Sequence, residues 1–264
     1  MIKNFEYKKS LGQNFINDDN IIKKMVNNVD IDAETLVVEI GPGAGVLSQQ
    51  IIPKCKYAIL YEIDTRLEDV LSVKLSKFNN YKIIFNDFLK ENVKKEVSNY
   101  EYSKLFVIAN LPYYITTPII EKLIKEVLPD KIVIMIQKEV ADRFCAKVNS
   151  KEYGYITAYL NYYYDIKKMF DVSRNCFTPK PNVDSTIISM TKINREVFVK
   201  DVEYFDIFLR DCFKYKRKNL KNNLKNYDLK TIEQVLNKHG LNLSNRAENI
   251  TSNIFVEITN ELLK

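Results

Sequence analysis

The stretch Leu36-Val-Val-Glu-Ile-Gly-Pro-Gly-Ala-Gly45 decides the fold predicted for this chain, because it joins a strand-like apolar run to a glycine-rich turn. Gly41 and Gly43 allow the backbone to turn tightly and to approach a ligand where a Cβ would collide. The spacing is G-x-G-x-G, not the G-x-G-x-x-G that holds a pyrophosphate at a helix N-terminus. This stretch therefore predicts a nucleotide-like cofactor without a pyrophosphate, and it favours S-adenosylmethionine over NAD.

Short apolar runs alternate with helical patterns through the first part of the chain. The expected strands are 35–40, 57–63, 81–86, 105–110, 131–137, 156–164 and 183–191, and helical patterns occupy 65–75 and 118–128. Strands that alternate with helices indicate a parallel sheet covered on both faces. No convincing helix separates the last two strands, so we expect them to close the sheet edge as an antiparallel pair. Seven strands with a terminal hairpin are typical of the α/β, Rossmann-like fold of class I S-adenosylmethionine-dependent methyltransferases.

The strand pattern ends at about residue 194. Segments 202–213, 215–226, 230–239 and 252–263 each have the apolar spacing of a short amphipathic helix. We therefore predict a Rossmann-like methyltransferase domain over residues 1–194 and a small all-helical domain over residues 195–264.

Composition and charge exclude several classes of protein. The 264 residues carry a net charge of +6, which leans mildly towards a polyanionic partner but could also follow from a lysine- and asparagine-rich composition. The four cysteines form no CxxC pair and there is one histidine, which argues against a zinc site, a disulfide framework and a Ser-His-Asp triad. With no signal peptide and no long apolar stretch, we expect a cytoplasmic protein that binds neither a metal nor a membrane.

Polar side chains follow the ends of the expected parallel strands, where α/β folds bind ligands. Glu62 lies about 20 residues beyond the glycines, at the position from which an acidic side chain binds ribose hydroxyls. Asp87 ends the third strand and could accept a hydrogen bond from the amino group of the cofactor's adenine. Each acid could instead cap a helix. Because Glu62 and Asp87 lie at strand ends in the same way as Gly41 and Asn110, both acids are predicted to bind the cofactor.

Asn110-Leu111-Pro112-Tyr113 ends the strand expected over 105–110. The Asn110 side-chain oxygen could accept one proton of a ring amine, and a backbone carbonyl of Leu111 or Pro112 could accept the other. Tyr113 offers a face on which a flipped base could stack. The motif therefore predicts an enzyme that holds a nucleobase amine against the cofactor.

Matching blocks of sequence cover essentially the whole chain and are far more specific than one glycine-rich turn. They are Ser10-Leu-Gly-Gln-Asn-Phe15, Glu39-Ile-Gly-Pro-Gly-Ala-Gly45, Glu62-Ile-Asp64, Asn86-Asp-Phe-Leu89, Asn110-Leu-Pro-Tyr-Tyr-Ile-Thr-Thr-Pro118, Gln137-Lys-Glu-Val-Ala-Asp-Arg143, Tyr153-Gly154 and Phe177-Thr-Pro-Lys-Pro-Asn-Val-Asp-Ser185. In these blocks the chain resembles ribosomal RNA adenine dimethyltransferases of the KsgA type and, more distantly, the Erm methyltransferases. The resemblance assigns cofactor contacts to Asn14, Ile16, Gly41, Glu62, Asp87 and Asn110, with Ile16 in place of the family's usual leucine.

The resemblance also implies an activity. A KsgA-type enzyme would act, as a monomer, on the 30S particle in ribosome biogenesis and dimethylate N6 of two adjacent adenines in a 3′-terminal hairpin of small-subunit (16S) rRNA. Phe177 would stack on the second face of the adenine, although it could also be a core aromatic. The alternatives are an Erm-type 23S rRNA methyltransferase that gives macrolide resistance, a non-catalytic assembly factor, and an NAD-dependent oxidoreductase.

Basic residues are dense between positions 210 and 225. Such density could neutralise several phosphates, and the resemblance favours RNA contact over the alternative of a solvated lysine-rich helix. Asn219, Asn222 and Asn223 are interleaved with them and could reach sugars or base edges. The predicted RNA-binding residues are Arg210, Lys214, Lys216, Arg217, Lys218 and Lys221, with Lys8 and Lys9 flanking the RNA entrance.

Overall fold

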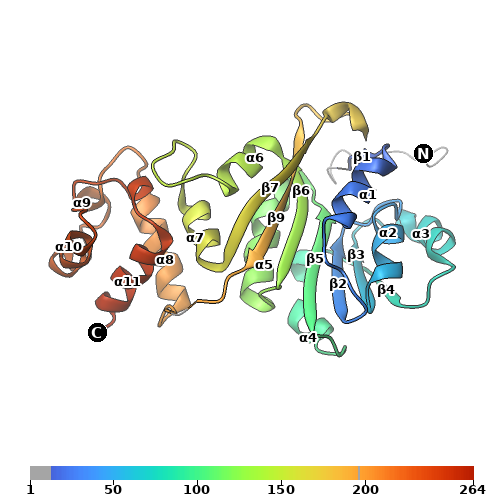
Figure 1. The fold of residues 1–264 in the computed structure, drawn as a ribbon, viewed down its shortest axis with the longest axis horizontal. Helices are drawn as coiled ribbons and strands as arrows, with labels where there is room; N and C mark the ends of the chain where they lie inside the picture. The colour runs from blue at the N-terminus through green and yellow to red at the C-terminus, as the bar shows by residue number, and fades with distance from the viewer. Residues whose placement is uncertain (1–12, 196) are drawn as a thin grey trace. The chain divides into compact units, whose positions relative to one another are not determined.

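The computed structural model of the protein describes residues 13–195 and 197–264. Contacts divide the chain into two compact units (Figure 1). The sheet unit contains the described residues up to Ala141 together with Lys167–Lys192, and the helical unit contains Asp142–Ile166 together with the described residues from Ile193 to Lys264. Residues 142–166 therefore pack with the C-terminal helices, so the units do not follow one cut in the chain. The domain boundary at residue 194 stays a prediction.

Most of the strands follow the sequence pattern, and the exception is described below. They are β1 (Phe15–Ile16), β2 (Thr35–Ile40), β3 (Tyr57–Glu62), β4 (Tyr81–Phe85), β5 (Lys104–Asn110), β6 (Lys131–Gln137), β7 (Tyr164–Val172), β8 (Phe177–Thr178) and β9 (Ser185–Lys192). Within the described residues, seven of them form one sheet in the order β4-β3-β2-β5-β6-β9-β7, and β1 pairs with β8. The five strands from β2 to β6 run parallel, and β9 runs antiparallel to β6. The predicted seven-stranded, mainly parallel sheet is confirmed.

The helices lie between these strands and beyond them. They are α1 (Asp19–Asn27), α2 (Ser48–Ile51), α3 (Glu68–Leu75), α4 (Val93–Val97), α5 (Thr116–Glu126), α6 (Lys138–Phe144), α7 (Tyr155–Tyr163), α8 (Val202–Phe213), α9 (Leu220–Asn223), α10 (Leu229–Lys238) and α11 (Ser252–Leu262). No helix in the described part of the chain is long and apolar enough to cross a bilayer.

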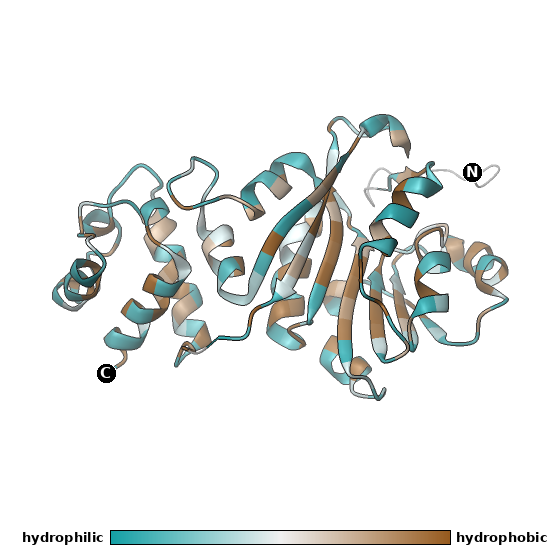
Figure 2. Cartoon of the chain, in the orientation of Figure 1, coloured by the Kyte–Doolittle hydropathy of each residue, from teal (hydrophilic) through white to brown (hydrophobic). Residues whose placement is uncertain are grey.

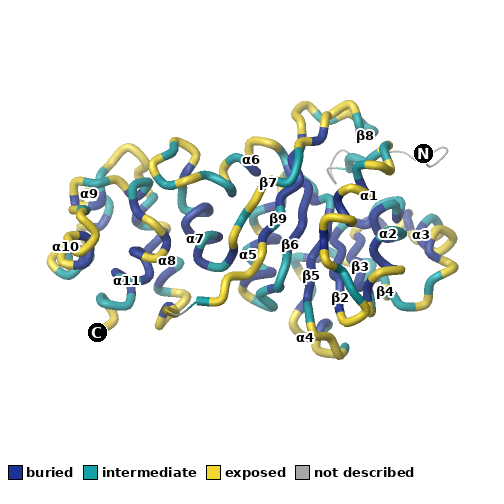
Figure 3. Tube along the Cα trace, viewed as in Figure 1, coloured by how far each residue is buried: buried dark blue, intermediate teal, exposed yellow. Residues whose placement is uncertain are grey.

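The central strands are apolar on both faces. Every residue of β2 is buried, as are five consecutive residues of β5 and of β6. Figure 2 shows these strands as hydrophobic, and Figure 3 shows them as the most buried part of the sheet unit. Parallel sheets have this pattern because crossover helices cover both of their faces.

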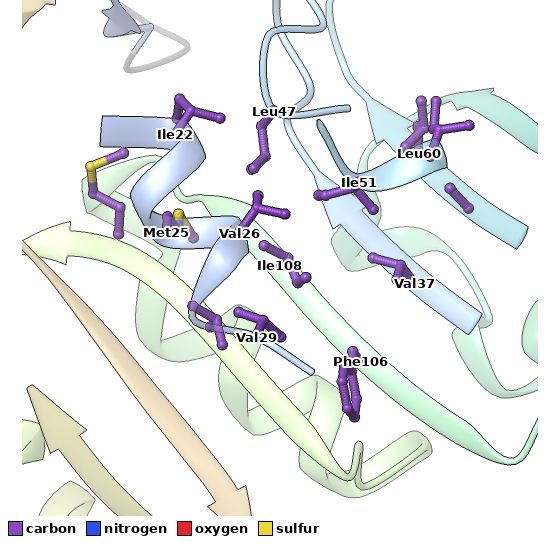
Figure 4. Packing of buried hydrophobic residues seen from close by; sticks show 14 of the residues in the cluster. Ile22, Met25, Val26, Val29, Val37, Leu47, Ile51, Leu60, Phe106 and Ile108 are labelled. Carbon is purple, nitrogen blue, oxygen red and sulfur yellow. The ribbon is translucent and has the colours of Figure 1, made fainter. Parts of the chain in front are cut away.

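Helix α1 shows how the core is built (Figure 4). Ile22, Met25 and Val26 are spaced to share one face of the helix, and they are almost fully buried against residues such as Ile51 and Ile108. Each such side chain contributes roughly 1.5–3 kcal/mol when it leaves water. This packing fixes α1 on the sheet. It therefore also fixes the end of the segment that leads into the helix.

The helical unit has its own aromatic core. Phe208 packs edge-on against Phe255, with ring centroids 6.4 Å apart, and Tyr162 lies 5.1 Å from Phe205. These rings join α7, α8 and α11, three segments that are far apart in the sequence. The unit therefore has a core of its own within the residues that the structure describes.

Two secondary-structure predictions are wrong. Residues 156–164, expected as a strand, form α7 and only Tyr164 begins β7. Their β-branched and aromatic composition favours a strand, but packing against α8 and α11 buries them on nearly every side and overrides that propensity. In the expected helix 215–226 only Leu220–Asn223 is helical, because the preceding run of like charges has no apolar face to bury.

Candidate active site

A cavity of about 870 Å³ lies at the carboxyl ends of the parallel strands. The strand order reverses between β2 and β5, and open α/β sheets bind ligands at such a point. The structure brings the predicted cofactor and base residues together around this one space. Its lining includes Asn14, Ile16, Gly41, Gly43, Glu62, Asp87 and Asn110, together with Leu111, Pro112 and Tyr113.

The glycine-rich turn begins directly after β2. Gly41 and Gly43 both have positive φ angles, +71° and +58°, which side chains rarely adopt. Among residues 13–195 and 197–264, a Cβ on Gly41 would meet only the Asn110 carbonyl, at 3.9 Å, so Gly41 leaves space for a ligand there. A Cβ on Gly43 would lie 2.8 Å from the ring of Phe15. The ring of Phe15 is therefore one reason for a glycine at this position, and the close ligand approach that the sequence suggested stays a prediction.

Glu62 is buried at the end of β3 and holds the turn in place. Its Oε2 accepts a hydrogen bond from the Gly43 N–H at 3.0 Å, and its Oε1 accepts one from the Asp64 N–H at 2.9 Å. Burial raises the pKa of Glu62, and the two backbone hydrogen bonds act in the opposite direction. Each carboxylate oxygen has a second lone pair. Glu62 can therefore hold the turn and still accept hydroxyl protons from a ribose.

Asp64 and Gln13 form a contact that sequence reasoning missed. Gln13 Nε2 donates to Asp64 Oδ2 at 2.7 Å, and Arg66 pairs with the same oxygen at 2.6 Å. The Arg66 guanidinium, with help from Gln13, lowers the pKa of Asp64 to about 2. Gln13 and Asp64 both belong to blocks that carry the family resemblance, but their sequence separation gave no sign that they pair. The contact ties the segment before α1 to the end of β3.

Asp87 carries out the capping role that was the alternative reading, and it also lines the cavity. Its Oδ1 accepts a hydrogen bond from the Leu89 N–H at 3.0 Å and so caps the short 3₁₀ turn Phe88–Lys90. Its side chain keeps Oδ2 and further lone pairs for a ligand. The two readings of Asp87 are therefore compatible.

Asn110 ends β5 with its amide held in one orientation. The side-chain Nδ2 donates to the backbone carbonyl of Asn14 at 3.1 Å. The next residue, Leu111, donates its N–H to the Met135 carbonyl at 3.2 Å, which fixes the backbone at the strand end. Because the nitrogen of the amide is engaged, the oxygen Oδ1 is the atom that Asn110 offers as an acceptor.

The two candidate carbonyls after Asn110 differ. The Pro112 carbonyl accepts hydrogen bonds from the Ile115 N–H and the Thr116 hydroxyl, both at 3.3 Å. The Leu111 carbonyl accepts none from the described part of the chain. Leu111 is therefore the better acceptor for a ligand.

Tyr113 is half-buried at the start of the 3₁₀ turn Tyr113–Ile115. Its hydroxyl shares a hydrogen bond of 2.7 Å with Ser185 Oγ, at the start of β9. Burial raises the pKa of Tyr113, so the phenol stays neutral at ordinary pH. The Ser185 contact holds the ring at the cavity wall, and sequence reasoning missed it although Ser185 closes the last matching block.

The structure does not bring Phe177 to the cavity. Its side chain is 3% exposed and belongs to the core cluster, and its backbone pairs with Ile16 across β1 and β8. A ring in this position offers no face to a base unless it turns out of the core. The predicted stacking role of Phe177 stays a prediction, and its burial agrees with the core-aromatic alternative.

Glu39, in the middle of the first motif, is an additional buried acid. Neither of its carboxyl oxygens has a hydrogen bond of normal geometry within the described residues. Burial raises the pKa of Glu39 to about 8, and the nearby Ser48 hydroxyl offsets only part of this effect. The group is therefore protonated near neutral pH. Sequence reasoning assigned it no role.

The basic segment of the helical unit runs from the end of α8 through a non-helical turn over residues 214–219 into α9. Lys214, Lys216, Arg217, Lys218 and Lys221 are exposed. Lys216 donates to the Lys151 carbonyl. Arg210 is exposed but engaged, because it pairs with Asp206 at 3.4 Å and lies 4.2 Å over the ring of Tyr155. Lys8 and Lys9 lie outside the described residues.

The asparagines of this segment hold it together. Asn219 caps α9 by accepting from the Asn222 N–H, and Asn223 donates to the Cys212 carbonyl and accepts from the Tyr215 N–H. Asn219 and Asn223 thus have structural partners, and their predicted contacts with RNA stay untested.

No group of three or more His, Cys, Asp or Glu side chains in residues 13–195 and 197–264 could hold a metal ion.

Comparison with known proteins identifies the family. The sequence matches the ribosomal RNA adenine dimethylase family over residues 4–264. The chain belongs to this family. Ribosomal RNA small subunit methyltransferase A of Geobacillus thermodenitrificans is 41% identical to it over 98% of this chain and 92% of the relative, and that of Bacillus mycoides is 39% identical over the same shares.

Solved structures agree with this assignment. A dimethyladenosine transferase from Plasmodium falciparum superposes with a TM-score of 0.80 at 26% identity, over 94% of this chain and 97% of the other. The 23S rRNA methyltransferase ErmE superposes with a TM-score of 0.72 at 21% identity, over 95% and 100%, which shows the shared fold. The class I methyltransferase fold with additional helices, the KsgA-type resemblance and the enzyme class, an rRNA adenine dimethyltransferase, are therefore confirmed.

Proposed function

We propose that this enzyme uses S-adenosylmethionine to dimethylate N6 of two adjacent adenines in a 3′-terminal hairpin of small-subunit rRNA, as a step in ribosome biogenesis. The orientation of Asn110 carries the proposal. Its Nδ2 is held by the Asn14 carbonyl, so its Oδ1 presents a fixed acceptor at the wall of the cavity. An adenine N6 amino group has two protons and needs such an acceptor.

The cavity fits the cofactor in size and in chemistry. Its volume lies in the range of about 300–1,000 Å³ that is typical of small-molecule sites. Gly41 leaves open space beside the turn, Glu62 has lone pairs for ribose hydroxyls, and Asp87 has them for an adenine amino group. Asn14 and Ile16 would close the cofactor site from the segment before α1.

The chain's own residues would position N6 rather than remove its proton. S-adenosylmethionine supplies a methyl carbon that is electrophilic because it is bonded to a positively charged sulfur. The Asn110 Oδ1 and the Leu111 carbonyl would hold the two N6 protons and favour tetrahedral nitrogen, which makes the lone pair available for attack. The amine sheds a proton after attack, so no dedicated base is needed. Tyr113 would stack on the base and limit its rotation.

The second methyl transfer places a demand on the same residues. After the first transfer N6 has one proton left, so one of the two acceptors loses its partner. The cavity must then leave room for the first methyl group beside Asn110 or Leu111. The Asn110 side chain is fixed by the Asn14 carbonyl, and the Leu111 acceptor is a backbone oxygen. Either acceptor could be the one that has no hydrogen bond to N6 during the second transfer.

RNA recognition would use the exposed cations of the helical unit. Lys214, Lys216, Arg217, Lys218 and Lys221 are available for phosphates, and Arg210 could join them from its pair with Asp206. Lys8 and Lys9 would flank the entrance. We further propose a monomer that acts on the 30S particle in the cytoplasm.

The test is methyl transfer from labelled S-adenosylmethionine to unmethylated 30S particles and, in parallel, to 23S rRNA, with Asn110→Ala as control. Dimethyladenosine in the 30S particles, absent with Asn110→Ala, is the expected result. Labelling of 23S rRNA alone would instead assign the enzyme to the Erm branch. Transfer to neither substrate would overturn the proposal and favour a non-catalytic assembly factor.

A further inference from the structure

Two consecutive tyrosines line the catalytic cavity but differ in their surroundings. Tyr113 is half-buried and bonded to Ser185, as described above. Tyr114, its neighbour in the same 3₁₀ turn, is 60% exposed and lines the same cavity. Its side chain makes no hydrogen bond and no ring contact within the part of the chain that the structure describes. Packing inside the protein therefore gives no reason for a tyrosine at this position.

An exposed ring beside a base-binding cavity has an obvious chemical partner. When one nucleotide is extruded from an RNA stack, the base beside it loses a stacking neighbour. Proteins replace such stacking with aromatic side chains, and each base–aromatic contact contributes enough to change affinity several-fold or more. Tyr114 adjoins the residue that would stack on the extruded base and lines the same cavity, so its exposed ring is within reach of a neighbouring base.

We propose that Tyr114 is a second RNA-stacking residue, which holds the adenine adjacent to the one being methylated. The inference rests on the proposed function, in which the two target adenines are neighbours. Tyr113 would hold the base inside the cavity, and Tyr114 would hold the other base unstacked at the rim. The second adenine then needs no new extrusion from the hairpin when its turn comes. Tyr114 is thus a positioning residue for completion of the second adenine.

The experiment compares wild type with Tyr114→Ala, Tyr114→Phe and the matched control Tyr102→Ala on unmethylated 30S particles. Tyr102 is also exposed, at 37%, and belongs to the sheet unit, but it precedes β5 at the opposite edge of the sheet. The readouts are KM for the particles, kcat, and the share of rRNA fragments methylated on one adenine only at partial conversion, measured by mass spectrometry. Affinity for S-adenosylmethionine is measured by calorimetry.

For Tyr114→Ala we expect KM for the particles to rise about tenfold, as loss of one stacked base predicts. Fragments methylated on a single adenine should accumulate, while cofactor affinity stays at the wild-type value. Tyr114→Phe keeps the ring and should stay within about twofold of wild type, as should Tyr102→Ala.

Three outcomes would overturn the inference. If the wild type is active and Tyr114→Ala leaves both KM and the fragment distribution unchanged, this inference is overturned and the proposed function stands. Weakened cofactor binding without a change in KM for the particles would make Tyr114 a cofactor contact. A wild-type protein that does not methylate 30S particles would overturn the proposed function, and this inference with it.

Discussion

The strand-end cavity and the basic turn of the helical unit position their functional groups in different ways. Glu62 accepts hydrogen bonds from the Gly43 and Asp64 N–H groups, and Asn110 donates one to the Asn14 carbonyl, at 2.9–3.1 Å. Arg217 and Lys218 are exposed side chains on the turn that the Asn223 side-chain amide anchors through hydrogen bonds to the backbone of Tyr215 and Cys212. Chemistry at N6 needs acceptors at fixed places, whereas phosphates need only positive charge nearby. The two regions should therefore respond differently to substitution.

The largest effect should come from Asn110→Ala. Loss of the fixed acceptor should lower kcat by about 10²–10³-fold, the usual cost of removing one positioned polar group from an active site. Affinity for S-adenosylmethionine should change far less than kcat, because Glu62 and Asp87 remain. Rates at saturating 30S particles and calorimetry measure the two quantities. Asn99→Ala, in an exposed turn, is the control, and equal losses in both quantities would contradict a role centred on the base.

The next largest effect should come from Glu62→Gln, which keeps the side-chain volume. An amide nitrogen cannot accept the hydrogen bond of Gly43 or Asp64, and an unpaired buried group costs about 1–3 kcal/mol. The Kd for S-adenosylmethionine should rise about 10- to 100-fold. Calorimetry on this variant and on Glu68→Gln, an exposed acid of α3, checks it. Equal affinities for both variants would remove Glu62 from the cofactor site.

A smaller effect should follow from Arg217→Ala combined with Lys218→Ala. Loss of two phosphate contacts should raise KM for 30S particles about tenfold and flatten its dependence on the logarithm of salt concentration by about 1.4–1.8. The rate at saturating particles should stay unchanged, because no atom of this turn lies in the cavity lining. Lys94→Ala with Lys95→Ala removes two exposed charges from α4 as the control. An identical salt dependence for both pairs would leave the basic turn without a specific role.

A further effect, on stability rather than on activity, should be seen in the pH dependence of the free energy of unfolding. The pKa of Glu39 is about 8 in the folded protein, above its ordinary value of 4.5, so the folded state binds a proton that the unfolded state releases. The free energy of unfolding should therefore fall as pH rises from about 4.5 to 8. Glu39→Gln should lose this contribution and become more stable relative to wild type at pH 8 than at pH 5. Urea unfolding at both pH values measures it, and parallel curves would show that Glu39 is ionised in the fold.

Sequence reasoning predicted the sheet well because β2, β5 and β6 each contain a mostly apolar, buried run, a pattern typical of strands covered on both faces. It failed for α7, where Ile156, Tyr159 and Tyr162 have strand-like chemistry but are buried by α8 and α11. Local propensity is worth less than the burial of several large side chains. It also failed for the basic turn, where like charges leave no apolar face for a helix.

The sequence by itself determined which residues end the parallel strands, and hence that Gly41, Glu62, Asp87 and Asn110 meet at one edge of the sheet. The alternation of strands and helices predicts parallel strands, whose carboxyl ends lie at one edge of the sheet, so this convergence needs no knowledge of distant contacts. Only the tertiary structure decided how those side chains are held. The pairs Gln13–Asp64, Tyr113–Ser185 and Asn110–Asn14 join residues 51, 72 and 96 positions apart. Such contacts depend on how whole elements pack, and no local pattern in the chain encodes them.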